Sequence, residues 1–422
     1  MSYAHVVATS CRIAPVSKNA LDRMSNLEVY GSSLDAEIAA HSTTAHHAKL
    51  RLVEKAFRQL LQASVPEAQC WLVGSFAAGI DIETSDLDFT VKIPAWAPET
   101  REYGILKRLQ SMLNGTDFSA RLIGGNIPVL KMVHRATGVD VDVSCNNDTP
   151  KRNTQLLVWY GQINPKFLVL AKAIKVWASK SGVENSKDGR LNSFALCLIL
   201  IQFLQSINEL PNLQELFQEL NGLIEIEDDD YCNRRNLAVE LEEKKIDWRT
   251  IRKGFRRHKK DVKGEKSLSD LLIGFFNYFG SFDFKTHWIS IKRGRKQTKN
   301  LNKHNEPTDD RLPYPYHRIV VEDPFLDTPY NCARTVYDTR HLERIQAEAR
   351  RAVTDILRTN SLFSRYPSPW RARIVGEGKE IDMRIKELKT WREHPWKFWN
   401  EEAQVVKYGG YEPWEEYMRG MA

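Results

Sequence analysis

The hydrophobic positions near the start of the chain predict one helix and then strands. Between Leu50 and Leu61 the apolar residues recur at the three- and four-residue spacing of one helix face, and Pro66 lies just beyond them. Strand-like runs follow at 70–73 and 87–93, separated by a turn that contains glycine. We therefore expect an amphipathic helix followed by two strands.

Strands and helices mix as far as about residue 145, and the pattern beyond it is mostly helical. A helix near 105–113 and paired strands at 128–133 and 139–143 complete the first part. The second part has an amphipathic helix from about residue 340 and four further predicted helices, at 165–180, 194–206, 213–220 and 268–279. We predict an α+β fold with a boundary near residue 150.

Composition excludes fibres, peptides and membrane-spanning helices. The 422 residues suffice for two or three domains, and their composition is that of soluble globular proteins. No run approaches the roughly 18 apolar residues that a membrane helix needs, so we expect no membrane partner. The six cysteines form no Cys-x-x-Cys pair, which favours reduced thiols in an intracellular protein.

The first 27 residues carry three basic residues against one acid, a weak likeness to an organelle transit peptide. A frayed N-terminal tail is the interpretation that we adopt. We expect a cytoplasmic protein, with a mitochondrial or nuclear location as the alternatives.

Two aspartates in the second predicted strand are the first candidates for chemistry. Asp86 and Asp88 alternate with apolar residues, so both project from one face of the strand. Carboxylates suit a hard cation such as magnesium, although exposed strands often carry such a pair without any function. The later strand at 139–143 has the same alternation, with Asp140 and Asp142 between valines, and can bring a third carboxylate beside the first two.

A Gly-Ser pair precedes these carboxylates. Gly74 lets the backbone approach a ligand closely, and the amide and hydroxyl of Ser75 can hold a phosphate oxygen. Two carboxylate-bound metal ions beside a phosphate can stabilise both the attacking and the leaving oxygen of an in-line displacement. The segment therefore indicates metal-assisted phosphoryl chemistry.

This arrangement resembles the polymerase β nucleotidyltransferase superfamily, and within it the noncanonical poly(A) polymerases and terminal uridylyltransferases. The resemblance extends from about residue 50 to 350 and rests on the Gly-Ser and Asp-x-Asp segments together with five further motifs in the family's order. These motifs lie at 142–147, 152–157, 174–178, 267–279 and 321–325.

The resemblance implies that Asp86, Asp88 and Asp142 are the catalytic and metal-binding carboxylates. It favours Asp142 over Asp140 because Asp142 precedes a Ser-x-Asn-Asn run. Asp140 is then a helper or a solvated residue. The implied cofactor is Mg²⁺, with Mn²⁺ as a possible substitute.

Several residues match family positions that contact the nucleotide. Asn153 and Thr154 match contacts to the sugar and triphosphate, and their alternative role is to cap the following helix. Ser193 has the same two interpretations. Phe194 stands where relatives usually carry a tyrosine that stacks on the base, and its alternative is a place in the core.

Lys175 matches a family lysine that holds the triphosphate. Relatives often carry a second lysine four residues later, where this chain has Ser179. Lys172 and Lys180 are the neighbours that would compensate, but we expect both to be solvated.

The residues that would read the base leave the choice of nucleotide open. Asp323 matches an acid that relatives use at the base edge, Asp327 follows one residue later than the family's second acid, and Tyr330 stands where several uridylyltransferases have a histidine. A carboxylate can accept a hydrogen bond from uracil or from the adenine amino group. We favour UTP because an acidic pair remains possible near the base.

Two basic groups are candidates for RNA contact. The first lies within 252–266, where a solvated face is an equal alternative. The second, free of acids, is the better candidate for binding an RNA backbone and comprises Lys292, Arg293, Arg295, Lys296, Lys299 and Lys303. The pair His46-His47 shows no metal-ligand spacing, and we expect surface positions for both.

We therefore predict a two-lobed nucleotidyltransferase with a mixed-sheet, palm-like catalytic lobe and a mostly helical lobe. It would add UMP to RNA 3′ ends without a template, with ATP-dependent poly(A) synthesis as the alternative and an inactive RNA-binding scaffold as a second. Its substrates would be RNA 3′ ends and UTP or ATP. The predicted divisions are a tail at 1–44, a catalytic domain at 45–150, a helical domain at 151–350 with a poly(A)-polymerase-associated region near 267–325, and a C-terminal extension at 351–422.

Overall fold

The computed structural model describes residues 44–93, 101–113, 115–125, 127–215, 266–299, 318–325, 330–359 and 361–366. The predicted helix at 213–220 lies mostly outside these residues. So do the basic run at 252–266, apart from its last residue, the predicted tail at 1–44, apart from Thr44, and most of the C-terminal extension.

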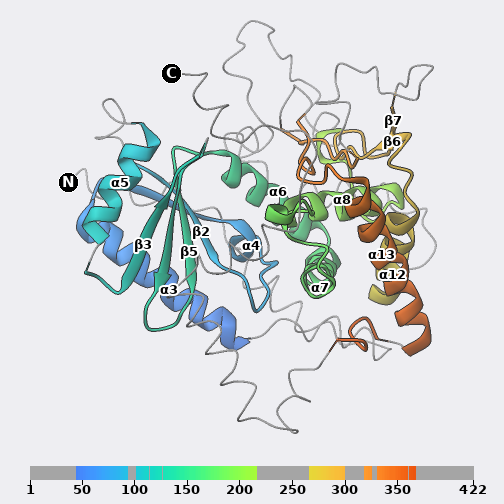
Figure 1. Cartoon of the computed structure of the whole chain (residues 1–422), viewed down its shortest axis with the longest axis horizontal. Coiled ribbons are helices and arrows are strands. Elements are labelled where there is room, and N and C mark those ends of the chain that lie inside the picture. Colours follow the sequence, from blue (N-terminus) through green and yellow to red (C-terminus); the bar gives the residue numbers. More distant parts are fainter. Residues whose placement is uncertain are drawn as a thin grey trace, which may run out of the picture. The chain divides into compact units, whose positions relative to one another are not determined.

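A five-stranded mixed sheet forms the first part of the chain (Figure 1). Its strand order is β1-β2-β5-β4-β3, and only the β2–β5 pair is parallel. The strands are β1 (Gln69–Val73), β2 (Leu87–Lys92), β3 (Phe118–Ile123), β4 (Val129–His134) and β5 (Asp140–Cys145). The mixed sheet confirms the predicted α+β fold.

Two helices cover one face of this sheet. They are α3 (Thr44–Ser64), which contains the predicted apolar stripe, and α5 (Glu102–Leu113). Phe57 of α3 is fully buried, with its ring 4.6 Å from that of Phe89 and 6.1 Å from that of Phe118. Burial of one such side chain contributes about 1.5–3 kcal/mol, so this core fixes which face of each strand points inward. The opposite face is therefore the one that carries Asp88 and Asp142.

Strand β3 was absent from our sequence-based expectation. Its polar and apolar residues alternate, and Phe118 packs in the core while Ser119 and Arg121 are exposed. The strand lies at an edge of the sheet and pairs only with β4. Its extended conformation therefore depends on that partner more than on its own short sequence.

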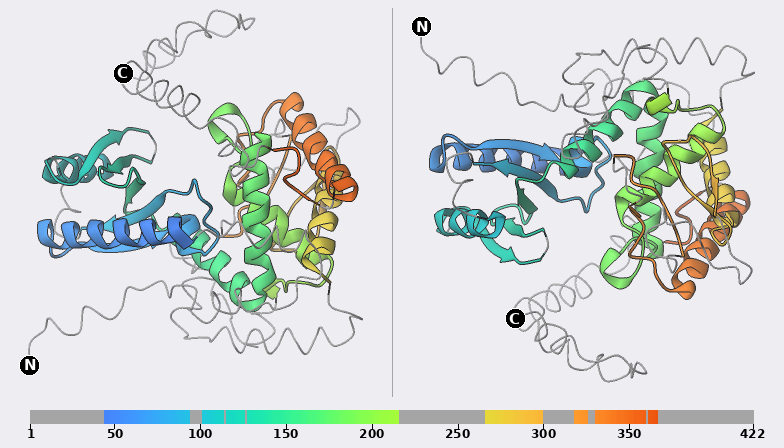
Figure 2. Two further views of the ribbon diagram at one scale, coloured as in Figure 1. Left: turned by 90° about the horizontal axis from the view of Figure 1, so that it is seen from below. Right: turned by 90° about the horizontal axis from the view of Figure 1, so that it is seen from above.

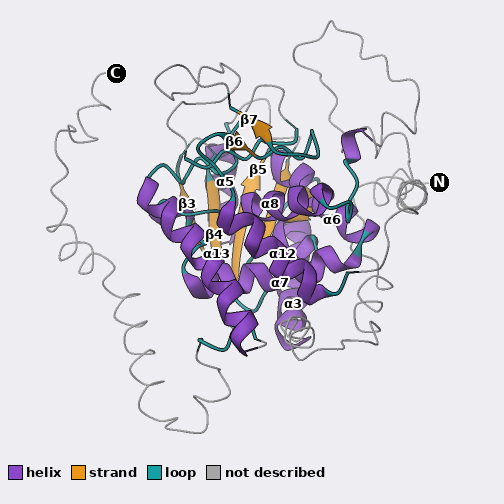
Figure 3. Cartoon of the chain, turned by 90° about the vertical axis from the view of Figure 1, so that its right-hand side faces the viewer, coloured by secondary structure: helices purple, strands orange, loops and turns teal. Residues whose placement is uncertain are grey.

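The chain after β5 is mainly helical. Its long helices are α6 (Thr149–Ile163), α7 (Pro165–Ser181), α8 (Ser193–Ser206), α12 (Leu268–Ser281) and α13 (Thr339–Thr359). The short elements are α4 (Gly74–Ala77) in the first part, and η4 (Ser186–Asp188), β6 (His287–Trp288) and β7 (Gln297–Thr298) in the second. Figures 2 and 3 show these long helices grouped beside the sheet.

Local sequence explains where these helices begin and end. The side chain of Asn164 accepts a hydrogen bond from the Lys166 amide at the start of α7, and Gly182 ends that helix in the left-handed conformation. A capping box formed by Ser267 and Asp270 begins α12. The predicted helices at 165–180, 194–206 and 268–279 are thereby confirmed.

The helices pack through aromatic side chains. The ring of Trp177 in α7 meets that of Phe276 in α12 edge to face at 4.7 Å, and both residues are buried. Among the described residues, no helix is both long and apolar enough to span a bilayer. The predicted boundary near residue 150 falls at the start of α6, where strands give way to helices, and the division into two lobes stays a prediction.

Candidate active site

The parallel pairing of β2 with β5 brings three carboxylates together. Asp88 and Asp142 are direct partners across this pair, and Asp86 lies immediately before β2. Each aspartate offers one carboxylate oxygen to a group in which all the oxygens lie within 4.8 Å of one another. The arrangement predicted from two strands 54 residues apart in sequence is therefore present, counting from Asp88 to Asp142.

These carboxylates repel one another in a poorly solvated position. Burial and the neighbouring charges of Asp86 and Asp142 raise the pKa of Asp88 to about 8. Burial, followed by the charge of Asp142, also raises the pKa of Asp86. Lys131 of β4 offsets the negative charge mainly at Asp142, because its ammonium group donates a hydrogen bond to the Asp142 carboxylate. The fully ionised form of the cluster is therefore unfavourable unless a cation binds to it.

A divalent cation fits this donor set. Hard cations such as Mg²⁺ take oxygen ligands, usually a few carboxylates together with substrate phosphates. Burial, followed by the charges of neighbouring aspartates, raises the pKa values of Asp86 and Asp88, and a bound cation would favour their ionised forms. The three carboxylates can thus hold a metal ion.

Gly74 has a role besides the one expected of it. Its φ is +77°, and a Cβ atom at this position would lie 2.0 Å from Oδ2 of Asp88. Glycine is therefore required because the backbone of α4 lies against a carboxylate of the site. Ser75 follows directly, and its hydroxyl donates a hydrogen bond to the hydroxyl of Ser85, 3.3 Å away.

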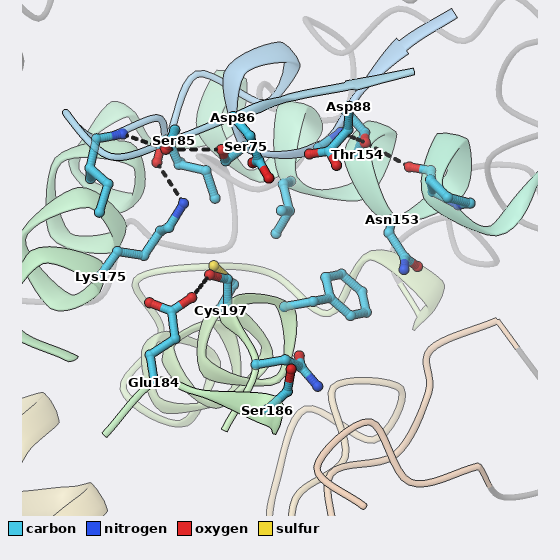
Figure 4. Close-up of a pocket in the computed structure, with 18 of the residues that line it drawn as sticks. Ser75, Ser85, Asp86, Asp88, Asn153, Thr154, Lys175, Glu184, Ser186 and Cys197 are labelled. Atoms are coloured by element: carbon cyan, nitrogen blue, oxygen red, sulfur yellow. Dashed lines mark hydrogen bonds between the residues drawn. The ribbon is translucent and has the colours of Figure 1, made fainter. Parts of the chain in front are cut away.

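A cleft of about 710 Å³ opens beside Asp86 and Asp88 (Figure 4). Its walls come from α4, the loop before β2, α6, α7, the segment around η4 and the start of α8. The predicted nucleotide-binding residues that line it are Gly74, Ser75, Asn153, Thr154, Lys175, Ser193 and Phe194. Asp142 is not among the lining residues and lies beside them, at the edge toward β4.

Asn153 and Thr154 are not helix caps. Helix α6 begins at Thr149 after the N-cap residue Asp148, so both residues lie inside the helix and face the cleft. The hydroxyl of Thr154 accepts a hydrogen bond from the Gly74 amide at 2.9 Å. It donates one to the Pro150 carbonyl at 2.6 Å. Thr154 therefore connects α6 to the glycine that lies against Asp88.

Lys175 projects from α7 toward the loop before β2. Its ammonium group donates a 3.3 Å hydrogen bond to the carbonyl of Ile80 and lies at the wall of the cleft. Lys180 is exposed, as expected. The prediction that Lys172 is solvated was wrong: it is only 3% exposed, and its Nζ lies 3.7 Å from a carboxylate oxygen of Asp81. The helix period places Lys172 on the face of α7 that packs against the loop.

The start of α8 contradicts the cap alternative for Ser193 and the core alternative for Phe194. The N-cap residue is Asn192, whose side chain accepts a hydrogen bond from the Ala195 amide at 2.8 Å. The hydroxyl of Ser193 instead donates to Glu184, which also lines the cleft. Phe194 is half-buried at the cleft wall and is not a core residue.

Sequence reasoning missed several polar residues of the cleft. Glu184, Asn185 and Ser186 line it from the turn before and within η4. They belong to no motif that we identified, and only the folding of this turn against α8 brings them to the cleft. The nearest sequence feature that could have pointed to these three residues was the apolar run that begins at Phe194.

Asp323 lies away from the cleft lining. It is 5% exposed, and its carboxylate accepts a 2.8 Å hydrogen bond from the Phe325 amide. Its own amide donates to the carbonyl of Tyr330 at 2.8 Å. Asp327 lies outside the described residues. The proposed acidic pair at the base edge therefore has no support from the described geometry.

Three of the predicted RNA-contacting cations are exposed around β7, namely Arg293, Arg295 and Lys296. Lys292 is half-buried, and its Nζ lies 3.6 Å from a carboxylate oxygen of Glu322. Lys299 does not belong to this surface, because it is buried and donates a 2.7 Å hydrogen bond to the Phe284 carbonyl. Burial lowers its pKa to about 8.

The adjacent histidines are not simple surface residues. His47 lies 3.3 Å from Asp81, and His46 lies 3.2 Å from the carbonyl oxygen of Ser85. Both are half-buried where α3 meets the loop before β2. The expectation of surface positions was therefore wrong, since α3 packs its N-terminal half against this loop.

Comparison with known proteins shows what this chain is similar to. Residues 32–162 match the family model described as "Poly(A) RNA polymerase, mitochondrial-like, central palm domain", and residues 267–329 match that of the "Cid1 family poly A polymerase". The Drosophila melanogaster poly(A) RNA polymerase gld-2 homolog A is 27% identical over 87% of this chain and 26% of its own length. The Xenopus laevis poly(A) RNA polymerase GLD2-A is 27% identical over 73% of this chain and 56% of its own length. The chain thus spans about half or less of these relatives.

Solved structures agree on the fold. The structure of mtPAP in complex with UTP has a TM-score of 0.60 and 19% identity, covering 85% of this chain and 76% of that one. The Cid1 poly(U) polymerase has a TM-score of 0.58 and 19% identity, covering 84% and 96%. The chain therefore has the nucleotidyltransferase fold of these structures. The family models and the curated relatives add that its sequence is similar to those of noncanonical poly(A) polymerases.

Proposed function

We propose that this protein is a template-independent RNA nucleotidyltransferase that adds AMP to RNA 3′ ends. The observation that carries the proposal is the cluster of three carboxylates, from Asp86, Asp88 and Asp142, at the edge of a cleft large enough for a nucleotide. Carboxylates clustered beside a phosphate-sized opening are the arrangement that metal-assisted phosphoryl transfer requires.

The three carboxylates would hold Mg²⁺. When bound, such ions lower the pKa of an attacking hydroxyl and offset the negative charge on the phosphates and on the leaving pyrophosphate. The protein's own contribution at this position is to keep three carboxylates converged by the β2–β5 register and by the absence of a side chain at Gly74.

The remaining cleft residues would bind and orient the nucleotide. The ammonium group of Lys175 supplies positive charge for the triphosphate, and the ring of Phe194 offers a surface on which a base stacks, worth about 1–3 kcal/mol. Asn153 presents an amide to the cleft, where it can bind the sugar. Together these contacts would place the α-phosphate beside Asp86 and Asp88 for in-line attack.

ATP is supported better than UTP. The curated relatives are named poly(A) RNA polymerases, which favours the alternative that the sequence pattern had ranked second. The argument for UTP rested on an acidic pair near the base, and Asp323 is turned into its own loop. The structural likeness to a poly(U) polymerase, at 19% identity, bears on the fold alone.

The test is extension of a labelled single-stranded RNA by the purified protein with Mg²⁺ and one nucleoside triphosphate at a time. We expect ladders of added nucleotides, longest with ATP. Longest products with UTP would overturn the nucleotide assignment alone. If none of the four nucleotides is added, while the folded protein still binds RNA, the proposed activity is wrong.

A further inference from the structure

The cleft leaves one of the three carboxylates outside its lining. Asp86 and Asp88 line the nucleotide-sized cleft, whereas Asp142 lies next to them on the side of β4. An incoming nucleotide that fills the cleft therefore approaches Asp142 only at its reacting end. A second substrate, whose hydroxyl attacks that end, has to reach the site from the Asp142 side.

The sheet register defines what lies on that side. Because paired residues project to the same face of a sheet, one row of side chains runs outward from the site. Asp142 pairs with Lys131, and Lys131 pairs with Arg121. Neighbouring strands lie about 4.8 Å apart, so Arg121 stands roughly 10 Å from Asp142 along this row.

This part of the sheet face is open. Arg121 and Lys131 are both exposed, as is Ser119 on the same face. The covering helix α5 and the long helix α3 pack on the opposite face, around Phe118, Leu130 and other buried residues. An extended strand can therefore lie across β5, β4 and β3 without displacing any described element.

The other end of the same row is closed. Beyond Asp88 the row reaches Val73 of β1, which is buried where α4 and α6 begin to form the cleft wall. A long polymer cannot leave in that direction. Among the described residues of this row, the β3–β4 side is the one that offers both an exit and positive charge.

We propose that the acceptor RNA binds across this side of the sheet, with Arg121 contacting the phosphate backbone a short distance from the 3′ end. Lys131 then has a positioning role between the two, since its ammonium group contacts the carboxylate of Asp142. The inference rests on the proposed function and adds to it the location of the second substrate. Backbone contacts of this kind are independent of base sequence and sensitive to salt.

The test measures the interaction with RNA and the interaction with the nucleotide separately, in variants of the whole chain. In Arg121→Ala we expect the KM for a single-stranded RNA to rise about 5–10-fold, while the KM for ATP stays within twofold. The slope of log Kd for RNA against log salt, measured by fluorescence anisotropy without nucleotide, should fall by about 0.7 for one lost phosphate contact on a single strand. Arg121→Lys should retain most of the RNA affinity, because it keeps the charge.

Lys107→Ala is the matched control. Lys107 is an exposed cation on α5, which packs on the opposite face of the sheet. Its loss should change neither the RNA KM nor the salt slope by more than the error of measurement. If Arg121→Ala and Lys107→Ala behave alike, the proposed RNA path is wrong.

The two proposals fail in different ways. A wild-type protein that binds RNA but adds no nucleotide would overturn the proposed function. In that case the RNA-binding measurement on Arg121→Ala would still test the proposed RNA path. Normal extension combined with an unchanged salt slope in Arg121→Ala would overturn the RNA path and leave the enzymatic assignment intact.

Discussion

Two groups of charged side chains that include residues of the loop before β2 differ in whether the protein neutralises their charge. In the first, Asp86, Asp88 and Asp142 converge, and burial together with the charges of its neighbours raises the pKa of Asp88 to about 8. In the second, Asp81 meets Lys172 at 3.7 Å and His47 at 3.3 Å.

The pKa of Asp81 moves in the opposite direction. Burial of Asp81 opposes ionisation, but the hydrogen bond to His47 and the charge of Lys172 outweigh burial and lower its pKa. Burial in turn lowers the pKa of Lys172, and Asp81 limits that shift. A carboxylate group that the fold leaves uncompensated is thus prepared for an external cation, whereas one compensated internally connects two elements.

The largest expected difference between the two groups is in catalysis. Asp88→Ala should lower nucleotide addition at least about 1,000-fold, because loss of the cation-binding carboxylate removes several kcal/mol of transition-state stabilisation. Asp140→Ala is the matched control, since Asp140 is an exposed aspartate on the same strand as Asp142. Rates are measured by RNA extension on proteins of equal thermal stability. Full activity of Asp88→Ala would refute the assignment of this group.

The second group should matter for stability. Asp81→Asn leaves Lys172 without its carboxylate partner, and we expect the free energy of unfolding to fall by about 3–5 kcal/mol in denaturant titrations. The double variant Asp81→Leu with Lys172→Met should recover most of this loss, because it removes both charges. If the double variant is no more stable than Asp81→Asn, the ion pair between Asp81 and Lys172 is not the reason that Asp81 stabilises the fold.

The pH dependence of that loss has a defined sign. The lowered pKa of Asp81 means that its contribution is present above the unfolded value of about 3.9 and disappears as the pH falls through the folded value. The stability difference between wild type and Asp81→Asn should therefore narrow below about pH 4. A difference that stays constant down to about pH 2 would contradict the ion pair.

The backbone at Gly74 lies against the carboxylate of Asp88. Gly74→Ala should lower activity about 100-fold, because the added methyl group lies where Asp88 now is and displaces its carboxylate. Gly138→Ala is a matched control. Gly138 has a similar φ of +70°, and a Cβ atom added there would have nothing within 4 Å. Both variants carry the backbone strain of about 1–2 kcal/mol, so equal activities would show that contact with Asp88 is unimportant.

The smallest expected effect is an increase in stability. Without divalent cations, Asp88→Asn should raise the free energy of unfolding by roughly 1–3 kcal/mol, because it relieves a carboxylate with a raised pKa. Addition of Mg²⁺ should stabilise the wild type more than the variant, because only the wild type keeps all three ligands. Thermal unfolding in EDTA and in Mg²⁺ measures both effects. Equal stabilisation of the two proteins by Mg²⁺ would place the bound ion elsewhere.

The edge strand β3 and the caps of α6 and α8 show where sequence patterns fell short. β3 has a short alternating pattern and depends on pairing with β4. The cap alternative for Thr154 and Ser193 was wrong because α6 and α8 begin after Asp148 and Asn192, and the start of a helix depends on where the preceding chain turns. Lys172 and His47 were misjudged for the same reason, since α7 and α3 pack on a loop whose position no local pattern reveals.

The chain's own order of residues determined the helix around 50–61, most of the strands, the resemblance to noncanonical poly(A) polymerases and the three aspartates, because apolar periodicity and short motifs are local properties. Only the tertiary structure decided that Gly74 touches Asp88, that Asp81 is neutralised while Asp88 is not, and that Arg121 extends the row from Asp142. Electrostatic state depends on distance and burial. Those quantities exist only once segments far apart in sequence have packed together.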